Sequence, residues 1–358
     1  MKKTAVCILF GGRSGEHEVS LRSAASVARN LERKKYDLLL VGIDPRGLWF
    51  LQEQARFSSH PQQGESLVLQ EGGQPVTVVP GQGLYVAGRK LELEVAFPVL
   101  HGSFGEDGTV QGLLEIAGIP YVGAGVLASA LAMDKEKTKK LWQQAGLPVV
   151  DFVVLREPSE QVPEQIRRTF GFPVFVKPAT LGSSVGISKV RCAGDLAGAL
   201  EQAFRFDTKV MIEPAVAGRE IECSVIGDER PEAFDPGEII PSHEFYSYEA
   251  KYLDPQGARL MVPADLPPAL RLEFRRLAVE AFRAVECSGM ARVDFFLEKG
   301  SQRILLNEIN TIPGFTNISM YPKLCEAGGL SYPRLLDRLI ELALERYARR
   351  QALRYSRG

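Results

Sequence analysis

The sequence has few of the features that mark a zinc-binding, disulfide-bonded or membrane-spanning protein. Its five cysteines are scattered without a C-x-x-C pair, and its four histidines show no metal-ligand spacing. No apolar run approaches the roughly 20 residues of a membrane-spanning helix, and the apolar run at 5–10 is short for a signal peptide. With 43 basic and 44 acidic residues, the chain has no net field to attract nucleic acid or anionic membrane. We therefore expect a cytoplasmic protein with reduced cysteines and neither nucleic-acid nor membrane partners.

The composition is that of a folded chain of several domains. Hydrophobic residues make up 45% of the chain and charged residues 24%, which is too apolar for a disordered protein. At roughly 150 residues per domain, 358 residues predict two to three domains. Composition alone indicates no function, so any indication has to come from local motifs.

The first third of the chain has the pattern of a parallel sheet. Apolar runs at 4–10 and 36–43 predict buried strands, and the spacing of apolar residues over 18–31 predicts a helix between them. This order forms a parallel βαβ unit with a right-handed crossover, so the fold class is α/β with an N-terminal Rossmann-like domain. A further strand is expected at 95–100, whereas the Gln-, Gly- and Ser-rich stretch 52–90 is interpreted as a variable excursion.

The remainder of the chain alternates strands and helices around one long stretch without periodicity. Residues 238–263 are aromatic and charged, and we expect a long ordered loop there, of the kind that forms functional lids. A helix capped by Asp134 and closed near Gly146 opens this part, and an amphipathic helix begins after Pro268. The other predicted elements are strands at 149–155, 173–177, 187–190, 209–213 and 220–227, helices at 195–206 and 332–350, and a hairpin of 291–298 with 303–310.

The predicted hairpin collects charged side chains on a surface that should be apolar. Side chains alternate along a strand, so Arg292 and Asp294 share one face, and Glu308 and Asn310 share one face of the partner strand. If the two faces coincide, two carboxylates, an amide oxygen and a guanidinium meet. Oxygen ligands of this kind suit Mg²⁺, which binds beside nucleotide phosphates. The alternative is an exposed hairpin face with salt bridges.

A glycine- and serine-rich segment lies between two predicted strands at 177–186. Its backbone N–H groups can converge on phosphate oxygens, and Lys177 adds a point charge. The segment is not a Walker A loop, because G-K-[ST] is missing and no helix follows. Alone it could be a plain flexible turn, but beside the hairpin carboxylates it predicts the second jaw of a nucleotide clamp.

The first predicted strand ends in a glycine turn that carries an acidic residue. Residues 10–20 do not satisfy G-x-G-x-x-G, and a strand followed by a glycine turn is often only structural. Glu16, however, stands at the carboxyl edge of a parallel sheet, where ligands bind in such folds. A carboxylate there repels phosphate and suits an ammonium group, which argues against an NAD enzyme.

Taken together, seven segments closely resemble the D-alanine–D-alanine ligase family of the ATP-grasp superfamily. They lie, in order, at 10–20, 101–108, 133–135, 177–186, 249–252, 292–294 and 308–314. The resemblance runs from about residue 4 to residue 344. It implies an N-terminal Rossmann-like substrate domain at 1–123, a small ATP-grasp lobe at 124–212 and a large lobe with lid and Mg²⁺ site at 213–358. The implied fold class is α/β overall and α+β in the two-lobed ATP-grasp part.

The resemblance also implies a reaction. ATP converts the carboxylate of one D-alanine into an acyl phosphate, and the amine of a second D-alanine attacks it. The products are D-alanyl-D-alanine for peptidoglycan synthesis, ADP and phosphate. The family further implies two Mg²⁺ ions, with Mn²⁺ as a substitute, and a homodimer.

Residues that match the family's motifs inherit expected roles at the first substrate. Glu16 would hold the ammonium group of the first D-alanine, with His101 nearby. Ser183 and Tyr252 would hydrogen-bond with Glu16 and so join the glycine-serine segment and the lid to the amino-acid site.

The remaining expected roles concern the reacting carbon, the second substrate, the nucleotide and the metal. Arg292 and the N–H of Gly314 would stabilise the tetrahedral oxyanion, and Lys251 and Ser319 would bind the second carboxylate. The expected nucleotide ligands are Lys135, Lys177, Ser183 and Ser184 at the phosphates and Glu213, Glu220 and Val216 at the adenosine, Val216 because Pro214 has no N–H. The expected metal ligands are Asp294, Glu308 and Asn310.

Two other functions fit parts of the same pattern. A related ligase could accept D-lactate or D-serine, although the lid sequence at 249–252 is of the dipeptide-forming type. A degenerate ligase could serve as an amino-acid sensor, although every expected Mg²⁺ ligand is present. Residue spacing does not distinguish D from L substrates.

Overall fold

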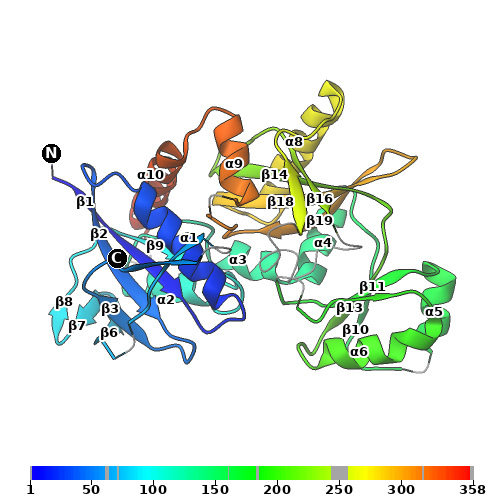
Figure 1. Ribbon diagram of the computed structural model, residues 1–358, viewed down its shortest axis with the longest axis horizontal. Coiled ribbons are helices and arrows are strands. Elements are labelled where there is room, and N and C mark those ends of the chain that lie inside the picture. The colour runs from blue at the N-terminus through cyan, green and yellow to red at the C-terminus, as the bar shows by residue number, and fades with distance from the viewer. Residues whose placement is uncertain are drawn as a thin grey trace.

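The computed structural model describes residues 2–60, 64–70, 72–159, 161–182, 185–242, 257–316 and 318–354. In this part of the chain, three sheets with their helices form three bodies that follow one another along the molecule (Figure 1). The N-terminal body and a small four-stranded lobe lie at opposite ends, and the body with the largest antiparallel sheet lies between them, above the small lobe.

The N-terminal sheet has the predicted parallel centre. Strand β1 (Thr4–Gly11) pairs in parallel with β2 (Tyr36–Ile43) and with β9 (Val95–Val99), and α1 (His17–Asn30) makes the crossover. The βαβ prediction is therefore confirmed. Because parallel strands are buried on both faces, their apolar runs are continuous and easy to identify in the sequence.

The interpretation of 52–90 as an excursion is wrong, because this stretch extends the sheet. Antiparallel strands follow one another outward from β2 in the order β3, β6, β7 and β8. Their bounds are Trp49–Gln52, Gln74–Val79, Gly83–Val86 and Arg89–Lys90, and a separate hairpin pairs β4 (Phe57–His60) with β5 (Gly64–Leu67). The strands are short, and glycine turns separate several of them, so their apolar signal is weak in the sequence.

Helices α2 (Thr109–Ala117), α3 (Val126–Met133) and α4 (Lys135–Gln144) lead out of this body. The Asp134 side chain accepts a hydrogen bond from the Lys137 N–H, which confirms the predicted cap of α4. Trp142 of α4 is fully buried and donates to the Ala281 carbonyl at 3.0 Å. Helix α4 therefore packs on the large sheet's body, although the sequence placed it in the small lobe.

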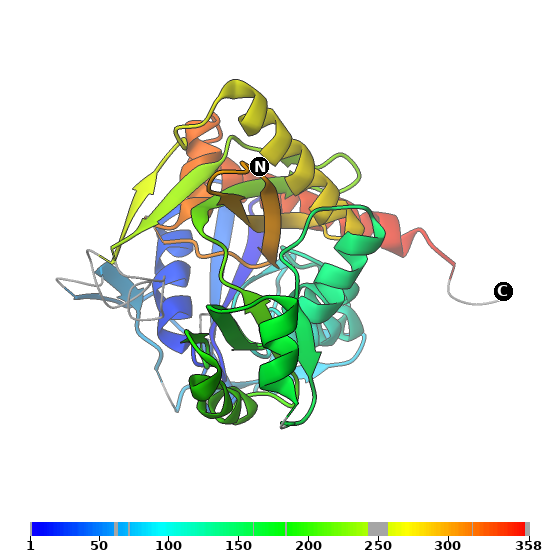
Figure 2. The ribbon, with the colours of Figure 1, turned by 90° about the vertical axis from the view of Figure 1, so that its right-hand side faces the viewer.

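The small lobe is a four-stranded antiparallel sheet covered by helices. Its strand order is β10-β13-β11-β12, and Figure 2 shows the lobe in front with α5 and α6 on its outer side. The bounds are β10 (Val153–Leu155), α5 (Val162–Thr169), β11 (Val174–Pro178), β12 (Ser188–Val190), η1 (Ala193–Asp195), α6 (Leu196–Phe204) and β13 (Val210–Pro214). Strand β13 runs across the predicted boundary at 212/213, and the domain limits remain predictions.

The large sheet has the order β17-β16-β14-β18-β19, with β15 on an edge of β14. The strands are β14 (Gly218–Gly227), β15 (Glu232–Ala233), β16 (Gly237–Pro241), β17 (Ala258–Met261), β18 (Gly289–Glu298) and β19 (Ile304–Asn310). The predicted amphipathic helix is present as α8 (Pro268–Ala284) and packs on this sheet, and α9 (Met320–Ala327), which the sequence did not indicate, contacts β14.

The predicted loop at 238–263 begins and ends in strands. Residues 238–241 of β16 pair with 258–261 of β17 in an antiparallel ladder, so a loop throughout this stretch is wrong. The centre of the predicted lid lies outside the described residues.

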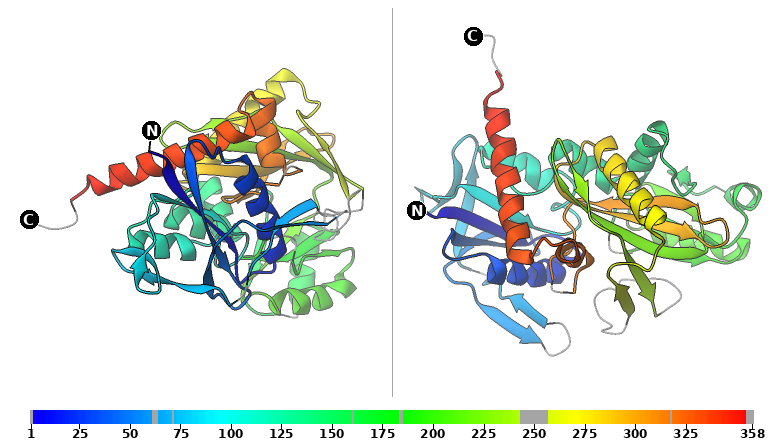
Figure 3. Two further views of the ribbon diagram at one scale, coloured as in Figure 1. Left: turned by 60° about the vertical axis from the view of Figure 1, so that its left-hand side comes forward. Right: turned by 90° about the horizontal axis from the view of Figure 1, so that it is seen from above.

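The last helix, α10 (Tyr332–Gln351), ties the N-terminal body to the large sheet (Figure 3). Arg346 donates to the Tyr121 carbonyl at 2.9 Å and to Ser288 Oγ at 2.7 Å, which joins the two bodies through one side chain. No helix in the described part of the chain is long and apolar enough to cross a membrane.

Candidate active site between the lobes

The two hairpin faces coincide, which is the condition that the sequence left open. Strands β18 and β19 pair Arg292 with Asn310 and Asp294 with Glu308, and side chains of directly paired residues share a face. On the other side of β18, Asp294 pairs with Glu222 of β14. Three carboxylates therefore lie in a row across three strands. Glu222 was not among the predicted site residues, although its position two residues after Glu220 places both on one face of a strand.

Arg292 is held between two of these carboxylates. Its Nε and Nη2 donate to the two oxygens of Asp294, each at 2.7 Å, and Nε lies 3.1 Å from Glu222 Oε2. Burial disfavours the charged guanidinium, but Asp294 and Glu222 outweigh burial and raise the pKa of Arg292. Asn310 donates its amide hydrogen to Asp294 at 2.9 Å. Asp294 is only 9% exposed, so this is not an exposed hairpin face.

The donor set fits Mg²⁺ in its chemistry. Asp294 and Glu308 provide carboxylate oxygens and Asn310 an amide oxygen, all hard ligands on one sheet face. Among the described residues, no group of three His, Cys, Asp or Glu side chains is arranged to hold a metal. Two carboxylates and an amide nonetheless suffice for an ion that keeps waters and takes its remaining ligands from phosphates.

Lys135 connects the acidic row to the glycine-serine segment. Its Nζ donates to the Leu181 carbonyl at 2.6 Å and lies 3.5 Å from Glu308 Oε2. The backbone N–H of Lys135 also donates to the Ala179 carbonyl at 3.0 Å. The start of the segment and the hairpin carboxylates therefore face one site, as the clamp prediction requires. Ser183 and Ser184 lie outside the described residues.

A buried ionic triad adjoins this site at the junction between the small lobe and helix α4. Glu213 of β13 contacts Lys177 of β11 at 2.5 Å through one oxygen and Lys139 of α4 at 2.7 Å through the other. Burial opposes ionisation of Glu213, but the two lysines outweigh it and lower the pKa of this carboxyl. Burial lowers the pKa of Lys139 to about 8, an effect that Glu213 opposes and Lys177 reinforces. The sequence analysis missed Lys139, although it stands one helical turn after Lys135.

Glu16 faces both the 101–108 loop and the glycine-serine segment. It is 8% exposed, and a β-carbon added to Gly102 would lie 2.6 Å from its Oε2. A β-carbon added to Gly182 would lie 3.2 Å from the same oxygen. Glycine at these two positions therefore lets the backbone of two separate segments approach one carboxylate.

His101 contacts protein groups through both ring nitrogens. Its Nδ1 lies 3.0 Å from the Ile312 carbonyl, and its Nε2 lies 3.0 Å from Ser23 Oγ. Ser23 Oγ also accepts a hydrogen bond from the Phe315 N–H. His101 thus supports the 312–315 loop, which carries Gly314.

The charge of His101 gives a testable pH dependence. Burial lowers its pKa, but Glu106, and at longer range Glu16, outweigh burial and raise the pKa above 6.5. The stabilisation from the protonated ring is therefore fully present below about pH 6.5 and is lost as the pH rises through the raised value.

We expect Glu106→Gln to lower the pKa of His101 and to abolish this part of the pH dependence. NMR titration of the ring and urea unfolding between pH 5 and pH 9 measure both effects. Asp107→Asn, in the same loop, is the control. An unchanged His101 titration in Glu106→Gln would contradict the assignment.

Gly314 and Ser319 lie side by side. A β-carbon on Gly314 would be 2.8 Å from Ser319 Oγ, and this oxygen accepts a hydrogen bond from the Thr316 N–H at 3.0 Å. Gly314, the predicted oxyanion donor, is therefore adjacent to Ser319, the predicted ligand of the second substrate's carboxylate. Lys251 and Tyr252 lie outside the described residues.

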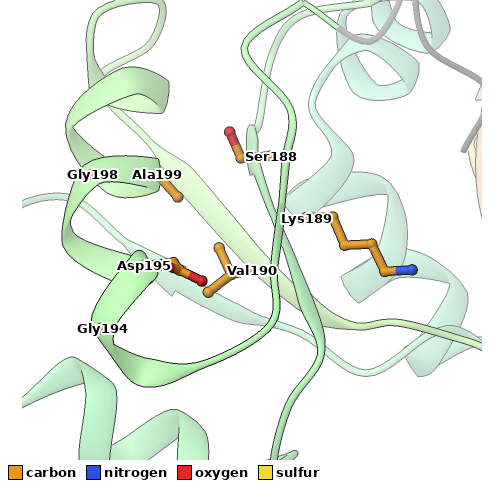
Figure 4. Close-up of a pocket in the computed structure, with 7 residues that line it drawn as sticks. All are labelled: Ser188, Lys189, Val190, Gly194, Asp195, Gly198 and Ala199. Carbon is orange, nitrogen blue, oxygen red and sulfur yellow. The ribbon is translucent and has the colours of Figure 1, made fainter. Parts of the chain in front are cut away.

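The predicted adenosine contacts remain predictions. Glu220 lies on β14, two residues before Glu222. The Ala215 N–H donates to the Pro173 carbonyl, so the N–H of the next residue, Val216, stays the predicted donor to adenine. A shallow hollow of about 410 Å³ on the outside of the small lobe contains none of the predicted site residues (Figure 4). It is lined by Ser188, Lys189, Val190, Gly194, Asp195, Gly198 and Ala199.

Two family models of known proteins together match almost the whole chain. The family described as "D-ala D-ala ligase N-terminus" matches residues 5–124, and "D-ala D-ala ligase C-terminus" matches residues 141–341. The chain belongs to the D-alanine–D-alanine ligase family. The architecture of the members of this family is the ATP-grasp fold, which confirms the predicted fold class.

Individual members of the D-alanine–D-alanine ligase family are similar over their full length. The chain is 49% identical over 355 residues to the D-alanine–D-alanine ligase of Solibacter usitatus, covering 99% of this chain and 100% of the relative. The solved D-alanine–D-alanine ligase of Coxiella burnetii is 38% identical with a TM-score of 0.84, covering 98% of this chain and 97% of that one. The VanG D-Ala:D-Ser ligase of Enterococcus faecalis is 34% identical with a TM-score of 0.82, covering 96% and 100%.

Proposed function

We propose that the protein joins two D-alanine molecules into D-alanyl-D-alanine at the expense of ATP, for peptidoglycan precursor synthesis. The observation that carries the proposal is the pairing of Arg292 and Asp294 with Asn310 and Glu308 on one sheet face, opposite the lysines and the glycine-serine segment. Relatives of nearly equal length and up to 49% identity support the same activity. The proposed location is the cytoplasm, where ATP is available.

In the first step, a carboxylate oxygen of the first D-alanine attacks the γ-phosphorus of ATP. The bond from this phosphorus to the bridging oxygen breaks, and ADP leaves with the electron pair. Lys135 and Lys177 hold the phosphates, and Glu16 holds the substrate's ammonium group away from them. When bound at Asp294, Glu308 and Asn310, two Mg²⁺ ions would neutralise the phosphate oxygens.

In the second step, the neutral amine of the second D-alanine attacks the acyl carbon. A C–N bond forms, the carbon–oxygen bond to phosphate breaks with its electron pair going to the phosphate, and the departing phosphate takes up the proton that the amine loses. Arg292 and the Gly314 N–H stabilise the oxyanion that develops on the acyl oxygen. Ser319, which lies beside Gly314, binds the carboxylate of the incoming amino acid together with Lys251.

Release of ADP tests the proposed function directly. We expect ADP release with D-alanine and Mg²⁺ and background release with L-alanine or without a divalent cation. A panel of D-alanine, D-serine and D-lactate as acceptors tests specificity, with dipeptide as the main product at neutral pH. Binding of D-alanine without ADP release would favour a sensor, and preferential use of D-lactate or D-serine would overturn the acceptor assignment.

The position of Glu16 gives a second test. Gly102→Ala would place a β-carbon 2.6 Å from Glu16 Oε2 and from Ser14 Oγ. We expect kcat/KM for D-alanine to fall about 10- to 100-fold, since a displacement of about 1 Å can cost 10²-fold. Gly88→Ala is the matched control, because φ is +76° there and +72° at Gly102, and a β-carbon at Gly88 meets nothing within 4 Å. Equal losses in the two variants would refute the contact.

We also propose a homodimer, as the family resemblance implies. Apolar side chains are exposed on the contacting helices α2 and α3, with Ile116 63% and Leu127 54% exposed. A charged residue at such a position should disrupt an apolar interface. We expect light scattering to show a dimer that Ile116→Glu shifts toward monomer. A wild-type monomer at micromolar concentration would overturn this proposal.

A further inference from the structure

One buried cation beside the proposed nucleotide site has no role in the steps above. Lys139 is 0% exposed and extends from α4 toward the small lobe. Its Nζ lies 2.7 Å from Glu213 Oε1, and the Val150 carbonyl lies 3.4 Å away. No part of this side chain is open to solvent, so Lys139 cannot itself contact a nucleotide in this arrangement.

The partner of Lys139 is shared. The other oxygen of Glu213 lies 2.5 Å from Lys177, whose side chain is 8% exposed and which stands at the start of the glycine-serine segment. Lys177 and Glu213 come from adjacent strands, β11 and β13, whereas Lys139 comes from a helix that packs on the other lobe's sheet. The triad therefore spans the junction between the two lobes.

The charges within the triad do not cancel, because two ammonium groups share one carboxylate. Glu308, which is not part of the triad, adds a further electrostatic attraction on Lys139. Burying an excess charge is costly unless a ligand or further partner compensates it. A site built only for stability would need one lysine for Glu213. The second lysine leaves a positive charge at the end of the triad that borders the glycine-serine segment, where an anionic phosphate would compensate it.

We propose that Lys139 is a positioning residue of the nucleotide site and that it acts through Glu213 on Lys177. By taking up one oxygen of Glu213, Lys139 weakens the hold of this carboxylate on Lys177 and leaves the Lys177 ammonium group available to a nucleotide phosphate. Without Lys139, Glu213 and Lys177 form a neutral one-to-one pair that competes with the phosphate. This inference rests on the proposed function, because it assigns the phosphate site to Lys177.

Direct ADP binding tests the inference independently of turnover. Calorimetry with ADP and Mg²⁺ would compare wild type with Lys139→Met, which keeps the length and apolar stem of the side chain, and with Lys139→Arg, which keeps the charge. We expect the dissociation constant of ADP to rise about tenfold or more in Lys139→Met and to recover largely in Lys139→Arg. Lys140→Met is the control, because Lys140 is mostly exposed and pairs with Glu136.

Steady-state kinetics and a double substitution separate positioning from a structural role. In Lys139→Met, KM for ATP should rise by the same factor as the ADP constant, while kcat at saturating ATP stays within about threefold. In a Glu213→Gln background, Lys139→Met should have little further effect on ADP binding, because Lys139 acts through Glu213.

The outcomes are distinct. A lower melting temperature with unchanged ADP affinity would overturn the inference and leave Lys139 with a structural role only. If Lys139→Met weakens ADP binding equally in the wild-type and Glu213→Gln backgrounds, Lys139 does not act through Glu213. If wild type binds ADP but releases none from ATP with D-alanine, the proposed function fails while the inference on nucleotide binding is still decided by the calorimetry.

Discussion

Arg292→Ala is expected to lower kcat about 10²- to 10³-fold while the affinity for ATP changes little. Arg292 lies on the acidic sheet face, held by Asp294 at 2.7 Å and Glu222 at 3.1 Å, and it is the proposed donor to the oxyanion. Loss of one such donor typically costs about 2.7–4 kcal/mol in the transition state. Since the oxyanion exists only after phosphoryl transfer has begun, ground-state nucleotide binding should be largely retained.

The two carboxylates that hold Arg292 make the controls important. Alanine leaves Asp294 and Glu222 close together without their shared cation, so the variant's melting temperature must be measured beside its kinetics. Arg303→Ala, at the far end of the same hairpin, removes an exposed arginine that pairs with Glu298 and should change neither property much. Near-wild-type kcat in folded Arg292→Ala would refute the oxyanion role.

Glu308→Gln is expected to weaken metal binding and to reduce turnover about as strongly as Arg292→Ala does. Glu308 pairs directly with Asp294 across the hairpin and lies 3.5 Å from Lys135 Nζ, so its loss removes one of two carboxylates from the predicted ligand set. Metal affinity should fall about 100-fold, since even residues that only orient a ligand contribute 10- to 100-fold.

Two measurements check this expectation. The Mg²⁺ concentration for half-maximal activity should rise, and Mn²⁺ binding followed by electron paramagnetic resonance should weaken in the same proportion without any turnover. Glu298→Gln, on the same hairpin but outside the site, is the matched control. If Glu308→Gln binds Mn²⁺ as the wild type does, Glu308 is not a metal ligand.

The parts of the site that could be predicted are those in which side-chain positions follow from the local periodicity of a strand or helix. The alternation of side chains placed Arg292 with Asp294 on one face of the first strand and Glu308 with Asn310 on one face of the second. The register of the hairpin then shows that these two faces coincide. The cap of α4 by Asp134 was equally local. The short antiparallel strands of 52–90 and the strands flanking the lid were missed, because each buries little and is recognised only through its pairing with a neighbour.

Contacts between residues that are far apart in the chain could not be predicted from the sequence. The position of His101 near the first substrate stays a prediction, and only the structure shows that its ring contacts Ser23 and the carbonyl of Ile312, which is more than 200 residues away in the chain. Glu222 and Lys139 carry no motif, and their partners come from other strands or another lobe. Such contacts depend on how the bodies pack, and packing is not encoded in any short window of residues.

The α/β class, the parallel start of the N-terminal sheet and the set of acidic and basic side chains available for nucleotide chemistry all follow from the order of the residues alone. Which of these side chains meet becomes known from the folded chain: Asp294 pairs with Glu222 and Glu308, and Glu213 contacts two lysines rather than one. Backbone periodicity is a property of neighbouring residues, whereas the pairing of these buried charges depends on strand register and on how helix α4 packs beside the small lobe, which bring together residues that are far apart in the chain.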